Sequence, residues 1–280
     1  MTKDFALGLR SVKLRAVDNL SLRIAPGQVF GLLGANGSGK STTIRIILGL
    51  LTPTLGRCSI FGAPSDQVEA RRHVGYLPES PYFYHYLTGY ELVRFYGQMG
   101  GLYGRRLAAR IDEVLAWIGL GEASERRVGS YSKGMLQRIG LAQVLVNDPR
   151  LIILDEPTAG LDAEGTEAVI GLIRRLRTDG KTVLLTSHLF EQMEELCDRV
   201  ALLDHGRLIV EGAVAELAQD PEWQVLTVSR LPEGELAELR EWLAERERVL
   251  ESVNPLQGRL QQVVREATQR SRRDSASPEP

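Results

Sequence analysis

The stretch GANGSGKS, residues 34–41, matches the pattern G-x-x-x-x-G-K-[ST] at every fixed position. Glycines let consecutive backbone amides converge on phosphate oxygens, and a helix that follows presents its positive end to the same anion. The apolar run VFGLL (29–33) precedes this loop and the helical pattern STTIRIILGLL (41–51) follows it. This context disfavours the alternative, a glycine-rich turn that merely joins a strand to a helix. The stretch therefore predicts a strand–loop–helix unit that binds nucleotide phosphates.

The chemistry of the loop residues indicates ATP as the ligand and Mg²⁺ as its cofactor. The ammonium group of Lys40 can reach the β- and γ-phosphates, and the hydroxyl of Ser41 suits Mg²⁺. Lys40 is therefore also a candidate catalytic residue. The nucleotide-binding residues expected in this stretch are Gly34, Asn36, Gly37, Ser38, Gly39, Lys40, Ser41 and Thr42.

Two further apolar runs end in polar side chains. LIIL (151–154) is followed by Asp155 and Glu156, and LLTS (184–187) by His188. Because ligands of a parallel sheet lie at the carboxyl ends of its strands, we expect Asp155 in the Mg²⁺ shell and Glu156 beside the attacking water. His188 then contacts the γ-phosphate or holds that water. A solvated acidic strand end and a structural histidine are the alternatives, which the phosphate loop makes less attractive.

Strands that alternate with helices predict an α/β fold with a mostly parallel sheet. Residues 20–33 (LSLRIAPGQVFGLL) are expected to form two strands around a Pro-Gly turn, and residues 51–62 another short strand. The helical pattern between about 82 and 145 predicts an inserted subdomain. After residue 212 the character changes, with a possible strand at EWQVLTVS (222–229).

Three more motifs identify a family. YSKGMLQR (131–138) resembles the signature sequence of ATP-binding cassette (ABC) proteins, in an S-K-G-M variant of the commoner S-G-G-Q. AGLD (159–162) resembles the D-loop and GYLPE (75–79) the Q-loop, so the resemblance covers about residues 14–212. GYLPE, YSKGM and TAGLD together are similar to the ATPase subunits of ABC-2-type exporters. These include drug, lipid, polysaccharide and sodium efflux systems, and the ATPase of a copper-site maturation system.

The resemblance implies a P-loop NTPase fold of the ABC nucleotide-binding type, with an antiparallel β part near the N-terminus and a small C-terminal extension. It implies a head-to-tail homodimer in which Ser132 and Gly134 of one protomer close on the γ-phosphate held by the other. It also adds Glu79 and Asp162 to the nucleotide contacts. The Mg²⁺ ligands expected on this basis are Ser41, Asp155 and Glu79.

Two positions depart from the family pattern. Glu79 stands where glutamine is usual, so this side chain still faces Mg²⁺ but loses an amide donor and adds a charge. An aromatic residue usually stacks on adenine just before the segment matching AVDNLSL (16–22), where this chain has Ser11 or Val12. The nearest upstream aromatic is Phe5. We therefore expect weak discrimination between ATP and GTP.

Aromatic residues are concentrated just after the Q-loop. The core of the helical subdomain is the plainer interpretation, and we expect it for Phe95 and Tyr96. Part of YFYHY (82–86) is expected to face outward, where the resemblance places a groove for a helix of a membrane subunit. The cluster comprises Tyr82, Phe83, Tyr84, Tyr86, Tyr90, Phe95 and Tyr96.

The expected domains are a cassette at 1–220, a C-terminal accessory region at 221–268 and a disordered tail at 269–280. One predicted helix, ELAELREWLAERERVL (235–250), carries an apolar side made of Leu236, Leu239, Trp242 and Leu243. A further helix is predicted at LQGRLQQVVREA (256–267).

The formal net charge of −2 gives no electrostatic case for nucleic acid, and Cys58 and Cys197 lack metal-type spacing. The sequence has neither a signal peptide nor a membrane-spanning run. We therefore expect a cytoplasmic protein, peripheral on the inner face of the cell membrane, that partners a multi-span permease.

Two alternatives stay open. One is a soluble ABC machine of ribosomes or DNA repair, which usually has two cassettes or a long coiled-coil insertion; this chain has neither. The other is an ATP-dependent clamp or regulator, which the intact Glu156 disfavours. The cargo and its direction are not encoded in this sequence.

Overall fold

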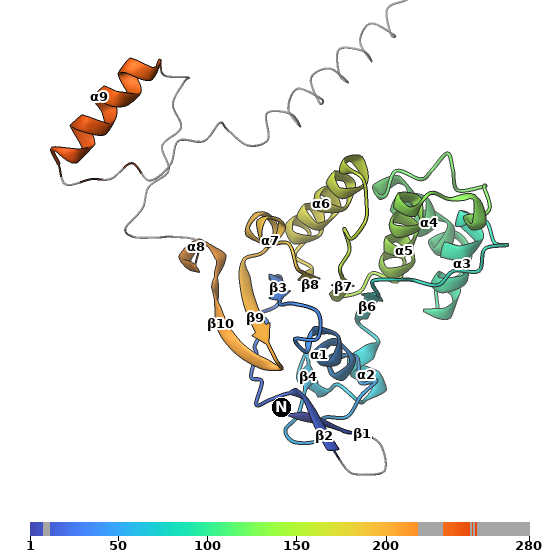
Figure 1. Cartoon of the computed structure of the whole chain (residues 1–280). Coiled ribbons are helices and arrows are strands. Elements are labelled where there is room, and N and C mark those ends of the chain that lie inside the picture. The colour runs from blue at the N-terminus through green and yellow to red at the C-terminus, as the bar shows by residue number, and fades with distance from the viewer. Residues whose placement is uncertain (8–11, 218–231, 247, 249, 251–280) are drawn as a thin grey trace, which may run out of the picture. The chain divides into compact units, whose positions relative to one another are not determined.

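The computed structural model describes residues 1–7, 12–217, 232–246, 248 and 250. The chain divides into two units, Met1–Gln219 and Asp220–Pro280. Nearly all of the described elements belong to the first unit (Figure 1). Among the described residues, no helix combines the length and the apolar character needed to cross a bilayer.

A six-stranded sheet forms the centre of the first unit, in the order β10-β9-β3-β8-β7-β6. The strands from β9 to β6 are parallel to one another, and β10 is an antiparallel strand at one edge. The prediction of a mostly parallel sheet is confirmed. The strands are β3 Val29–Leu33, β6 Val74–Leu77, β7 Leu151–Asp155, β8 Thr182–Ser187, β9 Arg199–Asp204 and β10 Arg207–Ala213.

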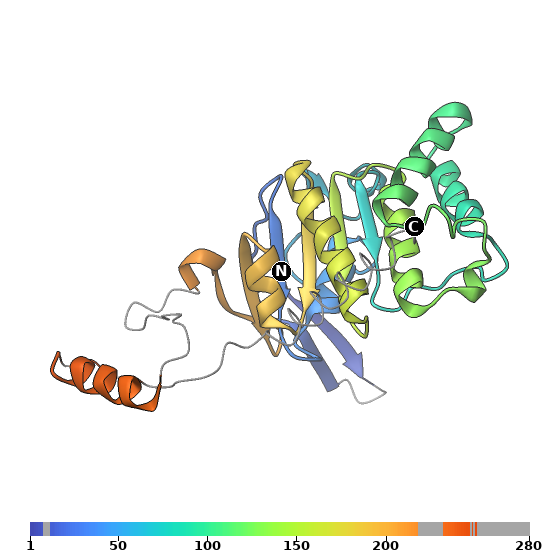
Figure 2. The same ribbon diagram turned by 90° about the horizontal axis from the view of Figure 1, so that it is seen from above.

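The apolar runs of the inner strands are continuous because both faces of the sheet are buried. Leu33 and Ile152 belong to a core shared with α6 (Ala163–Thr178) and α7 (Phe190–Leu196). Phe30 and Ile153 belong to a second core shared with α1 (Lys40–Ile47). Figures 1 and 2 show α6 and α7 on one face of the sheet and α1 on the other.

An antiparallel hairpin, β1 (Lys3–Leu7) with β2 (Val12–Val17), confirms the predicted N-terminal β part. A strand predicted at about residues 20–24, however, is wrong. Its apolar residues are buried or half-buried against the second core, but the segment joins no β-ladder. Leu20 N–H instead donates to the Met1 carbonyl at 2.9 Å. Apolar and polar residues alternate in this segment because one side of it packs on the second core, and not because it pairs with another strand.

The helical subdomain between β6 and β7 consists of α3 (Gly89–Met99), α4 (Gly104–Trp117), the short η1 (Val128–Ser130) and α5 (Lys133–Leu145). The three α-helices pack on one another. A capping box fixes the start of α3: Thr88 N–H donates to Glu91 Oε2 at 2.8 Å, and Glu91 N–H donates to Thr88 Oγ1 at 3.1 Å. The subdomain thus connects two strands that are neighbours in the sheet.

Smaller elements complete the described part. They are β4 (Ser59–Ile60), β5 (Ala63–Pro64), α2 (Val68–Arg71), α8 (Val214–Leu217) and, in the second unit, α9 (Glu233–Ala244). In α9, Trp242 is exposed and the guanidinium of Arg246 lies 4.1 Å from the centre of its ring. The predicted strand at 222–229 and helix at 256–267 lie outside the described residues.

Candidate functional site

The predicted phosphate loop lies between the end of β3 and the start of α1, and its glycines are required by close packing. A Cβ on Gly34 would come within 2.3 Å of Ser38 Oγ, and one on Gly39 within 2.6 Å of the Ala16 carbonyl oxygen. Gly34, Gly37 and Gly39 all have positive φ, a region that side chains disfavour. Close packing therefore requires glycine at positions 34 and 39, and the positive φ favours it at position 37.

Two polar groups of the loop show whether it fits an anion. The Lys40 ammonium group donates to the carbonyl oxygens of Gly34 at 2.6 Å and of Ala35 at 3.2 Å. Ser38 Oγ is buried and has no hydrogen-bond partner within the described part of the chain. A buried hydroxyl without a partner, and an ammonium group bonded to carbonyls of its own loop, both fit a loop that binds a phosphate.

A pocket of about 520 Å³ opens beside this loop and brings most of the predicted site residues together. Gly34 and Ser38 belong to the loop but do not line the pocket, and Ser132, Gly134 and Asp162 lie elsewhere. The residues that line it are Phe5, Leu14, Ala16, Ala35, Asn36, Gly37, Gly39, Lys40, Ser41, Thr42, Arg45, Glu79, Asp155, Glu156, Ala159 and His188.

Asp155 and Glu156 are held by a residue that the sequence motifs did not identify. Thr186 on β8 pairs with Asp155 across the parallel ladder. Its hydroxyl donates to Asp155 Oδ1 at 2.5 Å and accepts a hydrogen bond from Glu156 N–H at 2.9 Å. The available signal was Thr186 itself, one of three polar residues in the buried strand TVLLTS (182–187), with Thr182 and Ser187.

Glu156 and His188 form the other contact at this sheet edge. His188 Nδ1 lies 2.9 Å from Glu156 Oε2, within hydrogen-bond distance. Glu156 has φ of +49°, which is uncommon for a residue with a side chain and places this carboxylate in a tight turn after β7. The geometry brings two of the three predicted catalytic side chains, Glu156 and His188, into contact at the pocket.

The expected Mg²⁺ ligands fit a metal that is shared with a phosphate. Ser41, Asp155 and Glu79 line the same pocket. The described residues include no cluster of three or more His, Cys, Asp or Glu side chains able to hold a metal alone. Mg²⁺ usually takes one or two carboxylates and completes its shell with water and substrate phosphate oxygens. This donor set therefore suits Mg²⁺ bound together with ATP.

The signature and D-loop residues cap helices. Ser132 Oγ, at the N-cap of α5, accepts a hydrogen bond from Met135 N–H at 3.3 Å, and a Cβ on Gly134 would meet open space. Asp162, at the N-cap of α6, accepts from Gly165 N–H at 2.8 Å. Within one protomer these residues lie away from the pocket wall, although the peptide dipoles of α5 favour an anion at Ser132.

The aromatic stretch divides between surface and core. Tyr82 and Tyr86 are 86% and 69% exposed, whereas Phe83 is 2% exposed and packs in the subdomain core. The expectation that Phe95 belongs to the core is wrong, because its side chain is 39% exposed. Its ring lies edge-on against Tyr84, with centroids 5.9 Å apart. Tyr96 does pack against the core, as expected.

An aromatic residue does line the pocket on the hairpin side. Phe5 and Leu14 are partners across the β1–β2 ladder, and both contribute to the pocket wall. The Lys3 ammonium group lies 5.3 Å from the centre of the Phe5 ring. The position usual for the aromatic residue holds Ser11 or Val12, of which Ser11 lies outside the described residues. Phe5 is the aromatic side chain among the residues that line this pocket.

Comparisons with known proteins agree with this geometry. The model of the ABC transporter family matches residues 17–159. An uncharacterized ABC transporter ATP-binding protein of Nostoc is 38% identical over 226 residues, which is 76% of this chain and 68% of that protein. A Nod factor export ATP-binding protein of Cupriavidus metallidurans is 40% identical over 203 residues, 72% of this chain and 67% of that protein.

A linearmycin resistance ATP-binding protein of Bacillus subtilis is 36% identical, covering 81% of this chain and 75% of that protein. Among solved structures, a dimeric ATP-binding cassette in a post-hydrolysis state bound to ADP and phosphate superposes with a TM-score of 0.69. It is 28% identical, covering 76% of this chain and 96% of that one. An ATP-binding subunit of an ABC transporter, 29% identical, gives a TM-score of 0.68 and covers 77% and 90%.

Proposed function

Because the chain belongs to the ABC transporter family and is one of its ATP-hydrolysing cassettes, we propose that it is the ATPase subunit of an ABC-2-type exporter. In this proposal it works as a cytoplasmic protein, peripheral on the inner face of the membrane, and powers a separate multi-span permease. One observation carries the proposal. Glu79 lines the ATP pocket, and the residues that follow it in the sequence form an exposed aromatic surface. The relatives named for Nod factor export and linearmycin resistance support the exporter class.

For hydrolysis, Glu156 is the proposed general base. Its carboxylate, hydrogen-bonded to His188, polarises the water that attacks the γ-phosphorus. Lys40 exchanges its loop carbonyl partners for the β- and γ-phosphates, where its charge stabilises the transition state. The water oxygen then bonds to the γ-phosphorus while the bond from that phosphorus to ADP breaks on the opposite side.

Mg²⁺ would be held by Ser41, Asp155 and Glu79 and would neutralise charge on the β- and γ-phosphates. The Thr186 hydroxyl donates to Asp155 Oδ1 and so orients the carboxylate that would face the metal. Because Glu79 is a carboxylate, it adds a second negative charge on the metal side of the pocket. A chelator should therefore abolish turnover.

Dimerisation is the proposed way of completing the site. Ser132 and Gly134 lie at the N-terminus of α5, where backbone amides and the helix dipole favour an anion. Both lie off the wall of their own pocket, and the open space at Gly134 lets a phosphate approach the backbone. In a head-to-tail homodimer they would close on the γ-phosphate held by the partner subunit.

Phe5 is proposed to stack on the base. It lines the same pocket as the phosphate loop, together with its ladder partner Leu14. Stacking tolerates any base because every base has a π-face, so GTP hydrolysis within roughly tenfold of ATP hydrolysis is still expected.

The permease contact is proposed at the aromatic surface, which we define as Tyr82, Tyr84, Tyr86 and Phe95. Tyr84 contacts both Tyr86 and Phe95, so these three rings form one patch, and Tyr82 stacks on His85 of the same segment. Aromatic side chains with a polar tip are enriched at protein interfaces. Because residue 79 faces the nucleotide pocket, closure of the site can move the segment that carries this patch.

Site-directed crosslinking in native membranes tests this proposal. Cysteine placed at Tyr82 or Tyr86 should crosslink to a multi-span membrane protein, which mass spectrometry identifies. Cysteine at Ile209, an exposed residue of β10, is the matched control and should give no such product. Equal crosslinking from all three positions, or none from Tyr82 and Tyr86, would contradict the proposed interface.

A further inference from the structure

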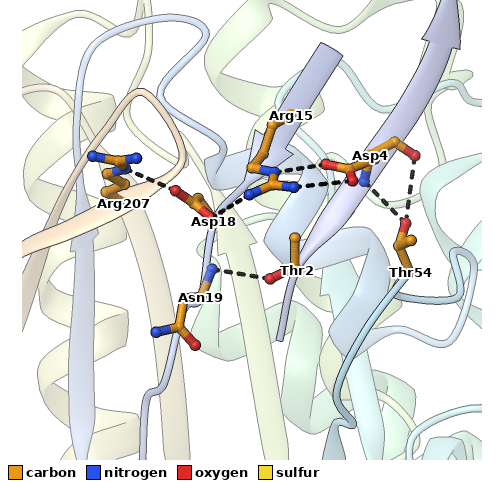
Figure 3. A network of polar contacts seen from close by, with 7 residues as sticks. All are labelled: Thr2, Asp4, Arg15, Asp18, Asn19, Thr54 and Arg207. Atoms are coloured by element: carbon orange, nitrogen blue, oxygen red, sulfur yellow. Dashed lines mark hydrogen bonds and ion pairs between the residues drawn. The ribbon is translucent and has the colours of Figure 1, made fainter. Parts of the chain in front are cut away.

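Four charged side chains form a chain of ion pairs behind the nucleotide pocket; we call Asp4, Arg15, Asp18 and Arg207 the charge network (Figure 3). Arg15 Nε lies 2.8 Å from Asp4 Oδ1, and Arg15 Nη1 lies 3.0 Å from Asp18 Oδ1. Arg207 Nε lies 2.8 Å from the other oxygen of Asp18. One guanidinium thus bridges two carboxylates, and a second guanidinium closes the row.

The Asp4–Arg15 pair of the charge network and the pocket wall occupy opposite faces of the hairpin. Asp4 pairs with Arg15 across the ladder, and Phe5 pairs with Leu14. Successive residues of a strand point to opposite faces, so the first pair lies behind the second. Phe5 and Leu14 line the nucleotide pocket. The ion pairs therefore brace the hairpin from the side that does not meet the nucleotide.

The network also connects the hairpin to the phosphate loop. Asp18 N–H donates to the Gly206 carbonyl at 2.8 Å, and Gly206 N–H donates to the Ser38 carbonyl at 2.9 Å. Cβ atoms added to Gly39 and Gly206 would come within 2.6 and 2.7 Å of the Ala16 carbonyl oxygen. The end of β2 is thus packed between the phosphate loop and the β9–β10 turn, which carries Arg207.

Two more hydrogen bonds anchor the open end of the hairpin, next to Asp18. Asp4 N–H donates to Thr54 Oγ1 at 3.0 Å, and Asn19 N–H donates to Thr2 Oγ1 at 3.1 Å (Figure 3). These bonds hold β1 to the loop after α1 and to the segment after β2. A two-stranded hairpin is marginal alone, so its angle toward the pocket depends on such contacts.

We infer that the charge network sets the position of the base-contacting face of the hairpin, and that Arg15 and Asp18 are positioning residues for the nucleobase. The inference rests on the proposed stacking of the base on Phe5. Neither residue touches the nucleotide: both act by fixing where Phe5 and Leu14 stand relative to the phosphate loop. The phosphates, held by the loop itself, do not depend on the network.

The charge state of the network is constant near neutral pH. The Arg15 hydrogen bond lowers the pKa of Asp4, and hydrogen bonds from Arg207 first and then Arg15 lower the pKa of Asp18. Hydrogen bonds to both carboxylates raise the pKa of Arg15. Because depressed carboxyl pKa values keep the pairs ionised down to acid pH, substitution is the appropriate probe of the network at neutral pH.

Calorimetric titration of two ligands tests the inference: ATP, which has a base, and inorganic tripolyphosphate, which has none. Arg15→Ala should weaken ATP binding about three- to tenfold, the scale of a lost bridging guanidinium, and leave tripolyphosphate binding unchanged. Arg15→Lys should restore part of the ATP affinity. Arg23→Ala is the matched control, since Arg23 is exposed and makes no ion pair with any residue that the structure describes.

A double-mutant cycle assigns the effect to the base wall. Phe5→Ala should weaken the binding of ATP and leave the binding of tripolyphosphate unchanged. Adding Arg15→Ala to this variant should weaken ATP binding no further. If Phe5→Ala binds ATP normally, the stacking pose is wrong and the inference falls with it. If Phe5→Ala weakens ATP but Arg15→Ala does not, only the network inference fails. Equal loss of ATP and tripolyphosphate affinity in Arg15→Ala would also overturn the network inference.

A substitute variant is needed in case Arg15→Ala does not fold. Arg207→Ala removes only the ion pair between Arg207 and Asp18, and it then replaces Arg15→Ala in every comparison.

Discussion

At the scale of single residues, Glu156 combines a positive φ with a hydrogen bond to His188, a geometry that holds the carboxylate for the proposed general base. Glu156→Gln keeps the shape and removes the basicity. ATP affinity should persist while turnover falls about 10²- to 10⁴-fold, the range for loss of general-base catalysis. Nucleotide binding and phosphate release measure the two effects. Lys40→Ala is the contrasting variant and should weaken ATP binding itself; wild-type turnover in Glu156→Gln would remove this residue from the chemistry.

Thr186 is the second residue to test, because its hydroxyl holds both acidic neighbours. Thr186→Val keeps the shape but leaves Glu156 N–H and Asp155 Oδ1 without this partner. A buried group left unsatisfied costs about 1–3 kcal/mol, so a lower unfolding temperature is expected together with a lower kcat. Thr186→Ser, which keeps the hydroxyl, should restore most of both. If the serine variant is as impaired as valine, the methyl packing rather than the hydrogen bonds is what matters.

The site residues differ in how well sequence predicts them, for a physical reason. The phosphate loop needs glycines and a lysine at fixed spacing, so the sequence alone identifies it. Thr186 is one threonine in an apolar strand, and its meaning comes from the register that sets it opposite Asp155. Phe5 reaches the pocket only through the pairing of β1 with β2.

At the scale of elements, the aromatic surface lies on the segment between β6 and α3 and on α3 itself. Tyr82→Ala with Tyr86→Ala removes two exposed rings and no core contact. ATPase activity of the isolated protein should remain within about twofold, since exposed substitutions away from special features change little, while membrane association falls. Sedimentation with membranes measures the association. Phe83→Ala is the comparison: as a core truncation it should cost about 3–5 kcal/mol of folding stability. Normal membrane association of the double variant would place the permease contact elsewhere.

Helices and strands were predicted correctly where the apolar periodicity of the sequence matches the element that forms. They were missed where residues are buried without that element, or where the element lacks the periodicity. The subdomain helices and the inner strands have long apolar patterns that tertiary packing respects. Residues 20–24 alternate because one face is covered, although no ladder forms there. β10 was not predicted, and a register shift between Leu208 and Val210 interrupts its period of two. Phe95 is exposed although it was expected in the core, because adjacent aromatic residues give no periodic signal.

At the scale of the whole molecule, the proposed homodimer depends on nucleotide trapped between two protomers. ATP-loaded Glu156→Gln should dimerise, because hydrolysis no longer releases the γ-phosphate that joins the subunits. Adding Ser132→Arg puts a bulky cation at the N-terminus of α5 and should keep the protein monomeric while ATP binding to the monomer stays nearly intact. Light scattering gives the mass in each case. An ATP-loaded Glu156→Gln protein that stays monomeric, with and without a permease, would count against head-to-tail closure.

The division after Gln219 offers the last test, whether the C-terminal unit contributes to nucleotide binding. The sequence changes character after residue 212, but the first unit of the fold continues to Gln219. β10 continues to Ala213, and a Cβ on Gly212 would come within 2.9 Å of the Leu217 side chain, so α8 closes over the end of this strand. Truncation after Gln219 should preserve ATP affinity and the unfolding temperature of the cassette. Truncation after Gly212 should lower that temperature, because it removes α8 and uncovers the sheet edge. Calorimetric unfolding and ATP titration of the two proteins side by side decide the matter: loss of ATP binding in the longer one would mean that residues beyond 219 complete the cassette.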